Sequence, residues 1–321
     1  MTPGQGSCQV TWLTDPDSEL LLRHNPLIDR LMTWSWESVF QLAAEPFWLA
    51  LNFEKEPRAL ALMQRAWAKE KRGFAFSEAG TLGIANEASR YALELGLSDE
   101  LKFKKNQKTY PQIIAEMAEL PYRGDDYIFV PGERADSFGN AFAERRNLKK
   151  FRSVIGLNTG CGSVFATKQW TVENFCELIE LLAAHDDIGI LLLGGKREET
   201  FNRQIMQRVG KKTMDSGCEN ELEDFFGIVN CCDAVVSSDS LGMHLAIGLK
   251  KKVIALFGST CAQEVDLFGR GEKVVTDFSC SPCYLQTCDK DPLCMEEMRG
   301  STVYAALCRA LDIAPQPSAK H

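Results

Sequence analysis

Residues whose side chains can do chemistry gather in the second half of the chain. Two short apolar runs, 234–237 and 253–257, are each followed by small hydroxyl, glycine or acidic residues. This pattern predicts two buried parallel strands, and the carboxyl ends of such strands are where α/β proteins bind ligands. A helix is expected over 240–248, and its first turn offers free N–H groups and a positive dipole to a diphosphate. Asp239 and His244 would lie beside that turn.

The same stretch allows a plainer interpretation, in which Asp239 and Ser240 only cap the helix. A strand–helix junction that served packing alone would not need Gly242 and His244 together in the first helical turn. We therefore favour a ligand-binding site at this junction over a purely structural cap.

A glycine-rich loop follows the predicted strand 154–158. It reads Asn-Thr-Gly-Cys-Gly-Ser over 158–163 and precedes Lys168 and Trp170. Such a loop can cradle phosphates, but it lacks the Gly-x4-Gly-Lys-Ser/Thr pattern of a P-loop. Lys168 could be a solvated surface lysine, and Trp170 could serve packing alone. The functional interpretation of Lys168 rests on topology, which would bring it to the same sheet edge as Asp239, where a diphosphate needs a cation.

Two glutamates follow the next predicted strand, 188–193. Gly194 and Gly195 lead through two basic residues into Glu198 and Glu199, without a G-x-G-x-x-G pattern, so a nicotinamide site is disfavoured. A carboxylate at this point can hold ribose hydroxyls. Acidic residues in a first helical turn can equally do no more than complement the helix dipole. The sequence leaves both interpretations open.

Four cysteines stand close together near the end of the chain, at Cys280, Cys283, Cys288 and Cys294. Four thiols can bind zinc tetrahedrally, yet structural zinc sites usually hold two close pairs separated by a longer loop. Zinc is therefore one interpretation, and a redox-labile thiol cluster or a loop with incidental cysteines is favoured over it. No other cofactor is expected.

Composition excludes several classes of function. The chain has 321 residues, long enough for two domains, and a net charge of −8, which argues against nucleic-acid binding. No apolar run approaches the ~20 residues of a transmembrane helix, and no signal-peptide pattern is present. Twelve cysteines without such a signal predict a reducing, cytoplasmic compartment. Peripheral contact with a membrane-borne substrate is compatible with this composition.

The second half of the chain alternates strands with helices. This order predicts a parallel, doubly wound sheet. The expected strands are 154–158, 188–193, 213–216, 234–237 and 253–257, and the expected helices are 171–183, 198–209, 221–229 and 301–311.

The first half is less regular. Strands are predicted over 9–14, 31–34, 47–52 and 128–131, and helices over 60–71 and 86–96. The basic stretch 143–152 is expected to be a linker. The predicted organisation is a first domain over 1–150, a second over 151–313 and a tail over 314–321.

Taken together, these residues resemble glycosyltransferase family 9, the ADP-heptose:lipopolysaccharide heptosyltransferases. The matching features are Lys168-x-Trp170 after the glycine-rich loop, Asp239-Ser240-x-Gly242-x-His244-x-Ala246, the strand end Ala255 to Thr260, and Cys280-Ser-Pro-Cys-Tyr with Cys294-Met295. They cover nearly all of the second half in order. In the first half the resemblance rests on residues 11–14, 25–30 and 72–74.

The resemblance implies two Rossmann-like domains facing a cleft, the GT-B arrangement, with the nucleotide sugar held by the second domain. It implies a metal-independent, inverting transfer of heptose to the lipopolysaccharide inner core, a glycolipid at the membrane surface, by a protein that is peripheral at the inner face of the inner membrane. By the same resemblance, Lys168, Thr159 and Gly160 would contact the diphosphate, and Glu198 or Glu199 would hold the ribose. Asp239 would hold hydroxyl groups of the sugar. The backbone of Ser240, Leu241 and Gly242 would bind phosphate oxygens, and His244 would shape that turn.

The chain departs from the family pattern at its start. Family members begin with an apolar strand and a Gly-Asp segment, whose aspartate is the expected catalytic base. Here residues 1–7 lead directly into what resembles the second strand, so that base is absent and the first sheet is expected to be incomplete and open. Asp15 and Asp17 are weak substitutes, and they could merely form a turn.

Three hypotheses follow from this departure. The favoured one is a heptosyltransferase whose sequence is truncated. The second is a non-catalytic nucleotide-sugar-binding relative that has lost its base. The third is an unrelated zinc-knuckle interaction protein, which the absence of bound zinc would eliminate.

Overall fold

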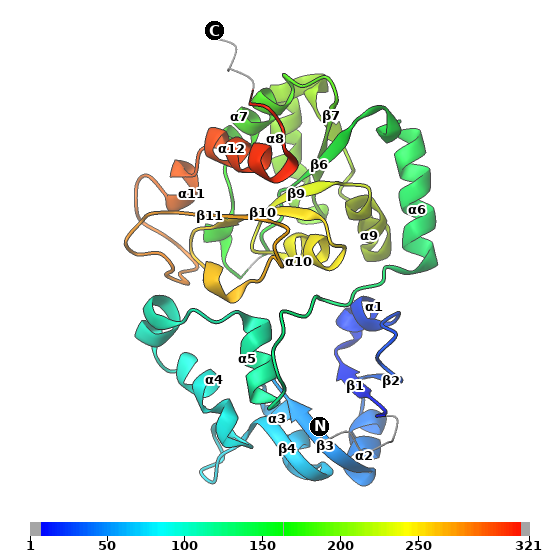
Figure 1. Ribbon diagram of the computed structural model, residues 1–321, viewed down its shortest axis with the longest axis vertical. Coiled ribbons are helices and arrows are strands. Elements are labelled where there is room, and N and C mark those ends of the chain that lie inside the picture. The colour runs from blue at the N-terminus through cyan, green and yellow to red at the C-terminus, as the bar shows by residue number, and fades with distance from the viewer. Residues whose placement is uncertain (1–7, 163, 316–321) are drawn as a thin grey trace. The chain divides into compact units, whose positions relative to one another are not determined.

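The computed structural model describes residues 8–162 and 164–315, which fold into two compact α/β units (Figure 1). The first unit holds the residues up to Asp126 together with Gln263–Asp266, and the second holds Tyr127–Ala262 and the residues from Leu267 on. The boundary predicted after residue 150 therefore lies inside the second unit. No helix within the described ranges is both long and apolar enough to cross a membrane.

The second unit alternates strands and helices as the sequence predicts. Its elements are α6 (Gly132–Arg145), β6 (Ser153–Asn158), α7 (Val172–Leu182), β7 (Ile188–Leu193), α8 (Glu199–Val209), β8 (Met214–Asp215), α9 (Leu222–Asn230), β9 (Ala234–Ser238), α10 (Leu241–Gly248), β10 (Lys252–Phe257), β11 (Gly271–Val275), α11 (Cys294–Glu297) and α12 (Gly300–Leu311).

These strands form one parallel six-stranded sheet in the order β11-β10-β9-β6-β7-β8. From β6 the chain first adds β7 and β8 on one side, and then crosses to add β9, β10 and β11 on the other. The order thus reverses between β6 and β9, which register Ile155 against Ala234 and Asn158 against Ser237. In an open parallel sheet, the crevice outside the strand ends at such a point is the expected ligand site.

The core of this unit explains why the strands read as continuous apolar runs. Every residue of β6, β7 and β9 is buried, because helices cover both faces of the sheet (Figure 1). Ile155 and Leu157 point into the cluster formed with α7, α8 and α12, where Phe175 and Trp170 are also buried. Fully burying one such side chain contributes roughly 1.5–3 kcal/mol. The sheet is therefore a rigid base for the loops at its carboxyl edge.

The first unit is built from shorter elements. They are β1 (Thr11–Thr14), α1 (Glu19–Leu22), β2 (Arg30–Thr33), α2 (Trp36–Ala44), β3 (Pro46–Asn52), α3 (Pro57–Arg65), β4 (Trp67–Phe76), β5 (Leu82–Ile84), α4 (Arg90–Leu95), a π-helical turn (Glu100–Lys105) and α5 (Tyr110–Met117). Its core gathers Leu60, Phe74, Ile113 and Met117.

The strands of the first unit form two separate sheets instead of one. β1 pairs with β2 in parallel, while β3 pairs with β4 in parallel and β4 with β5 antiparallel. Between residues 8 and 162, β1 and β3 each have one paired edge. The open sheet expected from the sequence is therefore present. Large aromatic side chains stay exposed on this unit, among them Trp12 on β1, Trp36 on α2 and Trp48 on β3.

Three expectations for the region before residue 153 are wrong. The predicted helix 60–71 ends at Arg65, and Trp67 begins strand β4, which pairs with β3. Residues 128–131 pair with no strand of the described chain, and Pro131 already has right-handed helical backbone angles before α6; the ring of Phe129 packs edge-on against that of Phe226 at 5.0 Å between centroids. The predicted linker 143–152 contains the end of α6 and a short 3₁₀ turn.

Candidate functional site

The site is built where β6 and β9 end, at the reversal of strand order. Asn158 closes β6 and is 5% exposed. Its Nδ2 atom lies 3.0 Å from the carbonyl oxygen of Gly160, 3.0 Å from Ser237 Oγ and 3.1 Å from Ser240 Oγ. This amide therefore ties the glycine-rich loop after β6 to the turn after β9, which fixes the two sides of the site.

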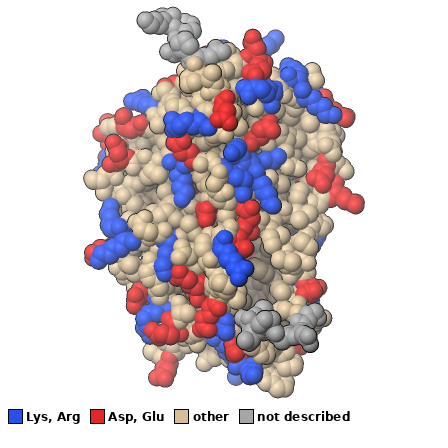
Figure 2. All heavy atoms as spheres, viewed as in Figure 1, with Lys and Arg blue, Asp and Glu red and all other residues tan. Residues whose placement is uncertain are grey.

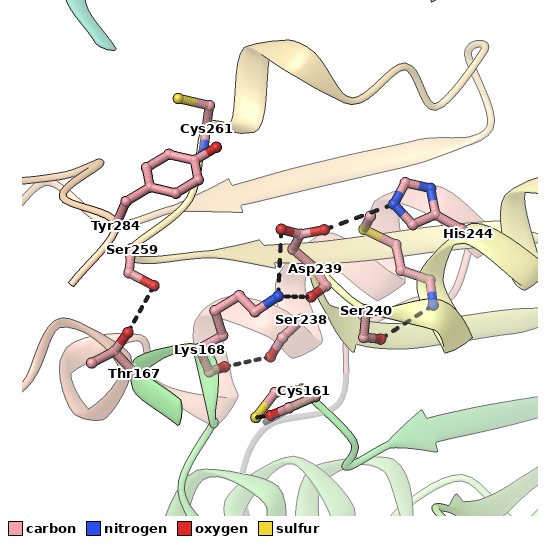
Figure 3. A network of polar contacts seen from close by, with 12 residues as sticks. Cys161, Thr167, Lys168, Ser238, Asp239, Ser240, His244, Ser259, Cys261 and Tyr284 are labelled. Carbon is pink, nitrogen blue, oxygen red and sulfur yellow. Dashed lines mark hydrogen bonds and ion pairs between the residues drawn. The ribbon is translucent and has the colours of Figure 1, made fainter. Parts of the chain in front are cut away.

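Lys168 and Asp239 meet at the centre of the site (Figure 3). Lys168 Nζ donates to the main-chain oxygen of Asp239 at 2.6 Å and lies 3.6 Å from its Oδ2. The lysine side chain is 14% exposed and the aspartate 25%. Ser238 Oγ also donates to the main-chain oxygen of Lys168 at 2.7 Å. The loop after β6 is thus fastened to the end of β9, and a partly buried cation is held at the strand ends.

His244 faces the other oxygen of Asp239. Its Nε2 lies 3.8 Å from Oδ1, and its ring centroid is 6.2 Å from that of Tyr127. Burial lowers the pKa of His244 below its ordinary value, and the Asp239 carboxylate only partly opposes that shift. The imidazole is therefore neutral at pH 7, and Lys168 is the cation of the site.

The first turn of α10 approaches the end of β6 very closely. Ser240 caps the helix, with its Oγ accepting from the N–H of Met243. A Cβ atom on Gly242 would stand 2.7 Å from Cγ of Asn158, so only glycine fits there. The N–H groups of Leu241 and Gly242 open the helix and have no acceptor within it, which leaves them able to bind an anion.

The glycine-rich loop is fixed mainly by hydrogen bonds beneath its surface. The Thr159 hydroxyl is buried and lies 2.6 Å from Asn202 Oδ1, and the N–H of Thr159 donates to the main-chain oxygen of Leu193 at 3.3 Å, so this residue positions the loop. Gln169 Nε2 donates to the main-chain oxygen of Thr159 at 2.9 Å, and its Oε1 accepts from Cys161 Sγ at 3.3 Å. Burial raises the pKa of the Cys161 thiol. Ser163, at the end of the predicted motif, lies outside the described residues.

The two candidate ribose ligands have different surroundings. Glu198 accepts from the N–H of Gly195 at 2.9 Å, and its carboxylate stands 3.5 Å from where a Cβ of Gly160 would be. It therefore lies beside the glycine-rich loop. Glu199 is paired with Arg203 at 2.6 Å, one helical turn further along, and is 56% exposed. Of the two, Glu198 is the one placed at the site.

Several residues of the site were not singled out by sequence reasoning. Asn158, Gln169 and Ser238 hold its loops together, and the Ser259 hydroxyl after β10 lies 3.0 Å from that of Thr167 (Figure 3). Asn158, Ser238 and Ser259 could have been found from their position, because each stands within two residues of a strand end, whereas Gln169, eleven residues after β6, has no such signal. Trp170, in contrast, is fully buried and donates to the main-chain oxygen of Met298, so it serves packing.

The remaining candidates lie elsewhere. Asp15, in the first unit, accepts from Arg58 Nη2 at 2.8 and 3.0 Å, and Asp17 stands in the 3₁₀ turn that follows. Cys294 packs against the end of β10, and burial together with the other three thiols raises its pKa. Among the described residues no group of three or more His, Cys, Asp or Glu side chains is arranged to hold a metal ion.

A parallel sheet with a cation and a helix N-terminus at its reversal point defines a Rossmann-like α/β protein. The profile of glycosyltransferase family 9 (heptosyltransferase) matches residues 108–293, more than half of the chain. The chain therefore belongs to this family.

A curated relative supports the assignment. Lipooligosaccharide heptosyltransferase 2 of Campylobacter jejuni is 28% identical over 161 residues, which are 49% of this chain and 50% of the relative. The chain thus spans about half the length of the curated relatives it matches.

Solved structures share the fold. The glycosyltransferase family 9 protein of Veillonella parvula superposes with a TM-score of 0.73 at 14% identity, covering 95% of this chain and 89% of that one. ADP-heptose lipopolysaccharide heptosyltransferase II of E. coli gives 0.63 at 15% identity, covering 94% and 89%. The likeness extends over both units, so the first unit is Rossmann-like although its sheet is divided.

Proposed function

We propose that this protein transfers heptose from ADP-heptose to the inner core of a lipopolysaccharide, with inversion at the anomeric carbon. The observation that carries the proposal is Lys168, whose ammonium group is held at the reversal point of a parallel sheet beside the first turn of α10. A leaving nucleoside diphosphate needs such a site, because negative charge builds up on it as the glycosidic bond breaks.

The cation and the helix together supply the stabilisation of the leaving group. Lys168 contributes a full positive charge, and the N–H groups of Leu241 and Gly242 contribute hydrogen bonds and the positive end of a helix dipole. These groups are fixed before the reaction, because Asn158 and Ser238 hold the loops that carry them. In this proposal they do the work that a divalent cation does in metal-dependent enzymes.

The carboxylates at the site would select the sugar. Asp239 is 25% exposed, and its carboxylate has one oxygen near Lys168 and the other near His244. We propose that it accepts hydrogen bonds from heptose hydroxyls. Glu198, next to the glycine-rich loop, would accept from the ribose hydroxyls in the same way. The acceptor glycolipid would be reached from the cytoplasmic side, at the membrane surface.

Transfer also needs a group that takes the proton of the acceptor hydroxyl. Asp15 is a poor base in the geometry described, because both of its oxygens accept from Arg58. The second candidate function is binding of the nucleotide sugar without transfer. The two candidates share the same donor site and differ only in the fate of the sugar.

One experiment tests the proposal and separates the candidates. The purified protein is incubated with ADP-heptose and a heptose-deficient lipopolysaccharide core, and products are followed by mass spectrometry, with the anomeric configuration read by NMR. Heptosylated core of inverted configuration supports transfer. Tight donor binding without product favours the non-catalytic candidate, and neither binding nor product refutes both.

A further inference from the structure

A group of five basic side chains surrounds the C-terminal end of α6, within the second unit. We call it the α6 basic cluster; it comprises Arg145, Arg146, Lys149, Lys150 and Arg152. All five residues are exposed. The chain as a whole carries a net charge of −8, and Figure 2 shows acidic and basic side chains interspersed over the visible face. Five cations within eight residues are therefore a local departure from the charge of the chain.

Most of this positive charge is not neutralised locally. Arg152 pairs with Asp187 at 2.6 Å, and Arg146 donates to the main-chain oxygen of Asp215 at 2.7 Å. Within the described parts of the chain, Arg145, Lys149 and Lys150 have no carboxylate partner. Unpaired cations close together repel one another, so their proximity lowers stability unless an anion binds to them.

A cavity of about 370 Å³ lies next to the cluster, lined by Phe138, Phe142, Arg145, Arg146, Ser216 and Asn220. The guanidinium group of Arg145 lies 5.7 Å from the ring centroid of Phe138, and that of Arg146 lies 5.7 Å from that of Phe142. Stacking on the rings limits the movement of both guanidinium groups. The cavity thus combines aromatic walls with two bidentate donors for phosphate.

We propose that the α6 basic cluster docks on an anionic membrane surface, with a lipid phosphodiester headgroup bound at the cavity between Arg145 and Arg146. Clustered cations are attracted to anionic lipids, and the guanidinium groups beside the cavity can donate to a phosphodiester. The inference rests on the proposed function insofar as a glycolipid acceptor gives the enzyme a reason to stay at the membrane. None of the residues that line the cavity is among those placed at the donor site, so the cluster is treated as a second site.

The test is co-sedimentation of the full chain with vesicles. Vesicles of phosphatidylcholine containing phosphatidylglycerol are compared with vesicles of phosphatidylcholine alone, at 0.05 and 0.5 M NaCl. The wild-type protein is expected to bind only the anionic vesicles, and to be released by salt, because salt screens exposed charges. Each lysine removed from an anionic surface weakens binding about five-fold. The double variant Lys149→Gln/Lys150→Gln is therefore expected to bind about 25-fold more weakly.

The matched control is Lys69→Gln/Lys211→Gln, which removes the same charge from exposed lysines outside the cluster. It is expected to bind as the wild type does. Equal weakening by both double variants would overturn the proposal, since net charge alone would then explain the binding. So would equal binding of the wild type to both kinds of vesicle, or binding of a polyphosphate in solution without binding of vesicles.

Activity separates this inference from the proposed function. Transfer to a delipidated, soluble core oligosaccharide is expected to be unchanged in Lys149→Gln/Lys150→Gln, while transfer to core embedded in anionic vesicles falls. Absence of transfer in every variant contradicts the proposed function, yet the vesicle-binding result still decides the docking surface. Loss of transfer to the soluble core in this variant alone would contradict the inference, because it would place the cluster in the catalytic machinery.

Discussion

Replacing Lys168 by methionine removes the ammonium group and keeps most of the apolar stem. Lys168 Nζ is held by the main-chain oxygen of Asp239 at 2.6 Å, and its side chain is 14% exposed, so its charge acts in a partly desolvated place. A hydrogen bond to a charged group contributes about 1.5–3 kcal/mol. If Lys168 bonds the diphosphate of ADP, this loss corresponds to a dissociation constant about 10- to 150-fold larger.

Isothermal titration calorimetry with ADP measures the change directly. Lys211→Met is the matched control, because Lys211 is an exposed lysine of the same unit and is not among the residues of the site. The Lys211→Met variant is expected to bind ADP as tightly as the wild type does. Circular dichroism and the melting temperature of Lys168→Met establish that the variant is folded. A folded Lys168→Met protein that binds ADP within two-fold of the wild type would refute the role assigned to Lys168.

Three further predictions concern the same unit. Asp239→Asn is expected to leave ADP affinity within a few-fold, because Lys168 is positioned by the main-chain oxygen of Asp239, and to weaken ADP-heptose binding at least ten-fold; equal loss for both ligands would contradict a sugar-binding role. Gly227→Ala would place a Cβ 2.2 Å from the main-chain oxygen of Ala135, so urea denaturation is expected to show a loss of about 1–3 kcal/mol, and an unchanged midpoint would mean that α6 and α9 separate easily. Burial lowers the pKa of His244 in the folded protein, so the unfolded chain takes up this proton first as pH falls. The resulting contribution of His244 to the free energy of unfolding is fully present above about pH 6.5 and is lost as pH falls through the folded pKa. His244→Gln is therefore expected to flatten the dependence of melting temperature on pH between 7.5 and 5, and parallel curves for both proteins would argue against this.

The sequence predicted strands correctly where nearly all residues of a strand are buried. The strands β6, β7, β9 and β10 lie mid-sheet and read as apolar runs with turn residues at their ends, so both their existence and their carboxyl edge were predicted. The same reasoning predicted that Lys168 and Asp239 lie at the carboxyl edge of the sheet, and the structure places them in contact. Topology carried this prediction, because parallel strands must end on the same side.

The elements of the first unit were harder to predict from the sequence, and the reason is physical. Residues 60–71 contain strong helix formers throughout, and nothing local ends the helix at Arg65; pairing of Trp67–Phe76 with β3, distant in sequence, overrides the propensity. The helix α6 was missed because it contains Gly139, which weakens a helical pattern. That glycine is required by packing, since a Cβ there would stand 2.7 Å from the main-chain oxygen of Gly227.

The sequence also did not predict which residues each side chain of the site contacts. Glu198 and Glu199 are neighbours with the same chemistry, and only the structure shows that one lies beside Gly160 while the other pairs with Arg203. The inward hydroxyl of Thr159 depends likewise on Asn202, a residue of α8 with no local signature. Such choices are decided by contacts between elements, which a single sequence does not display.

The central claim is that the reversal point of the second sheet binds an ADP-sugar without a metal ion. Thermal-shift titration with ADP, UDP, GDP and CDP, each with magnesium and with EDTA, tests it most directly. Ligand at about 100 times its dissociation constant stabilises a protein by about 2.7 kcal/mol, enough to raise the melting temperature by several degrees. A rise with ADP alone, equal in magnesium and in EDTA, is the expected result. A rise that requires magnesium, a preference for another nucleotide, or no rise with any of the four would contradict it.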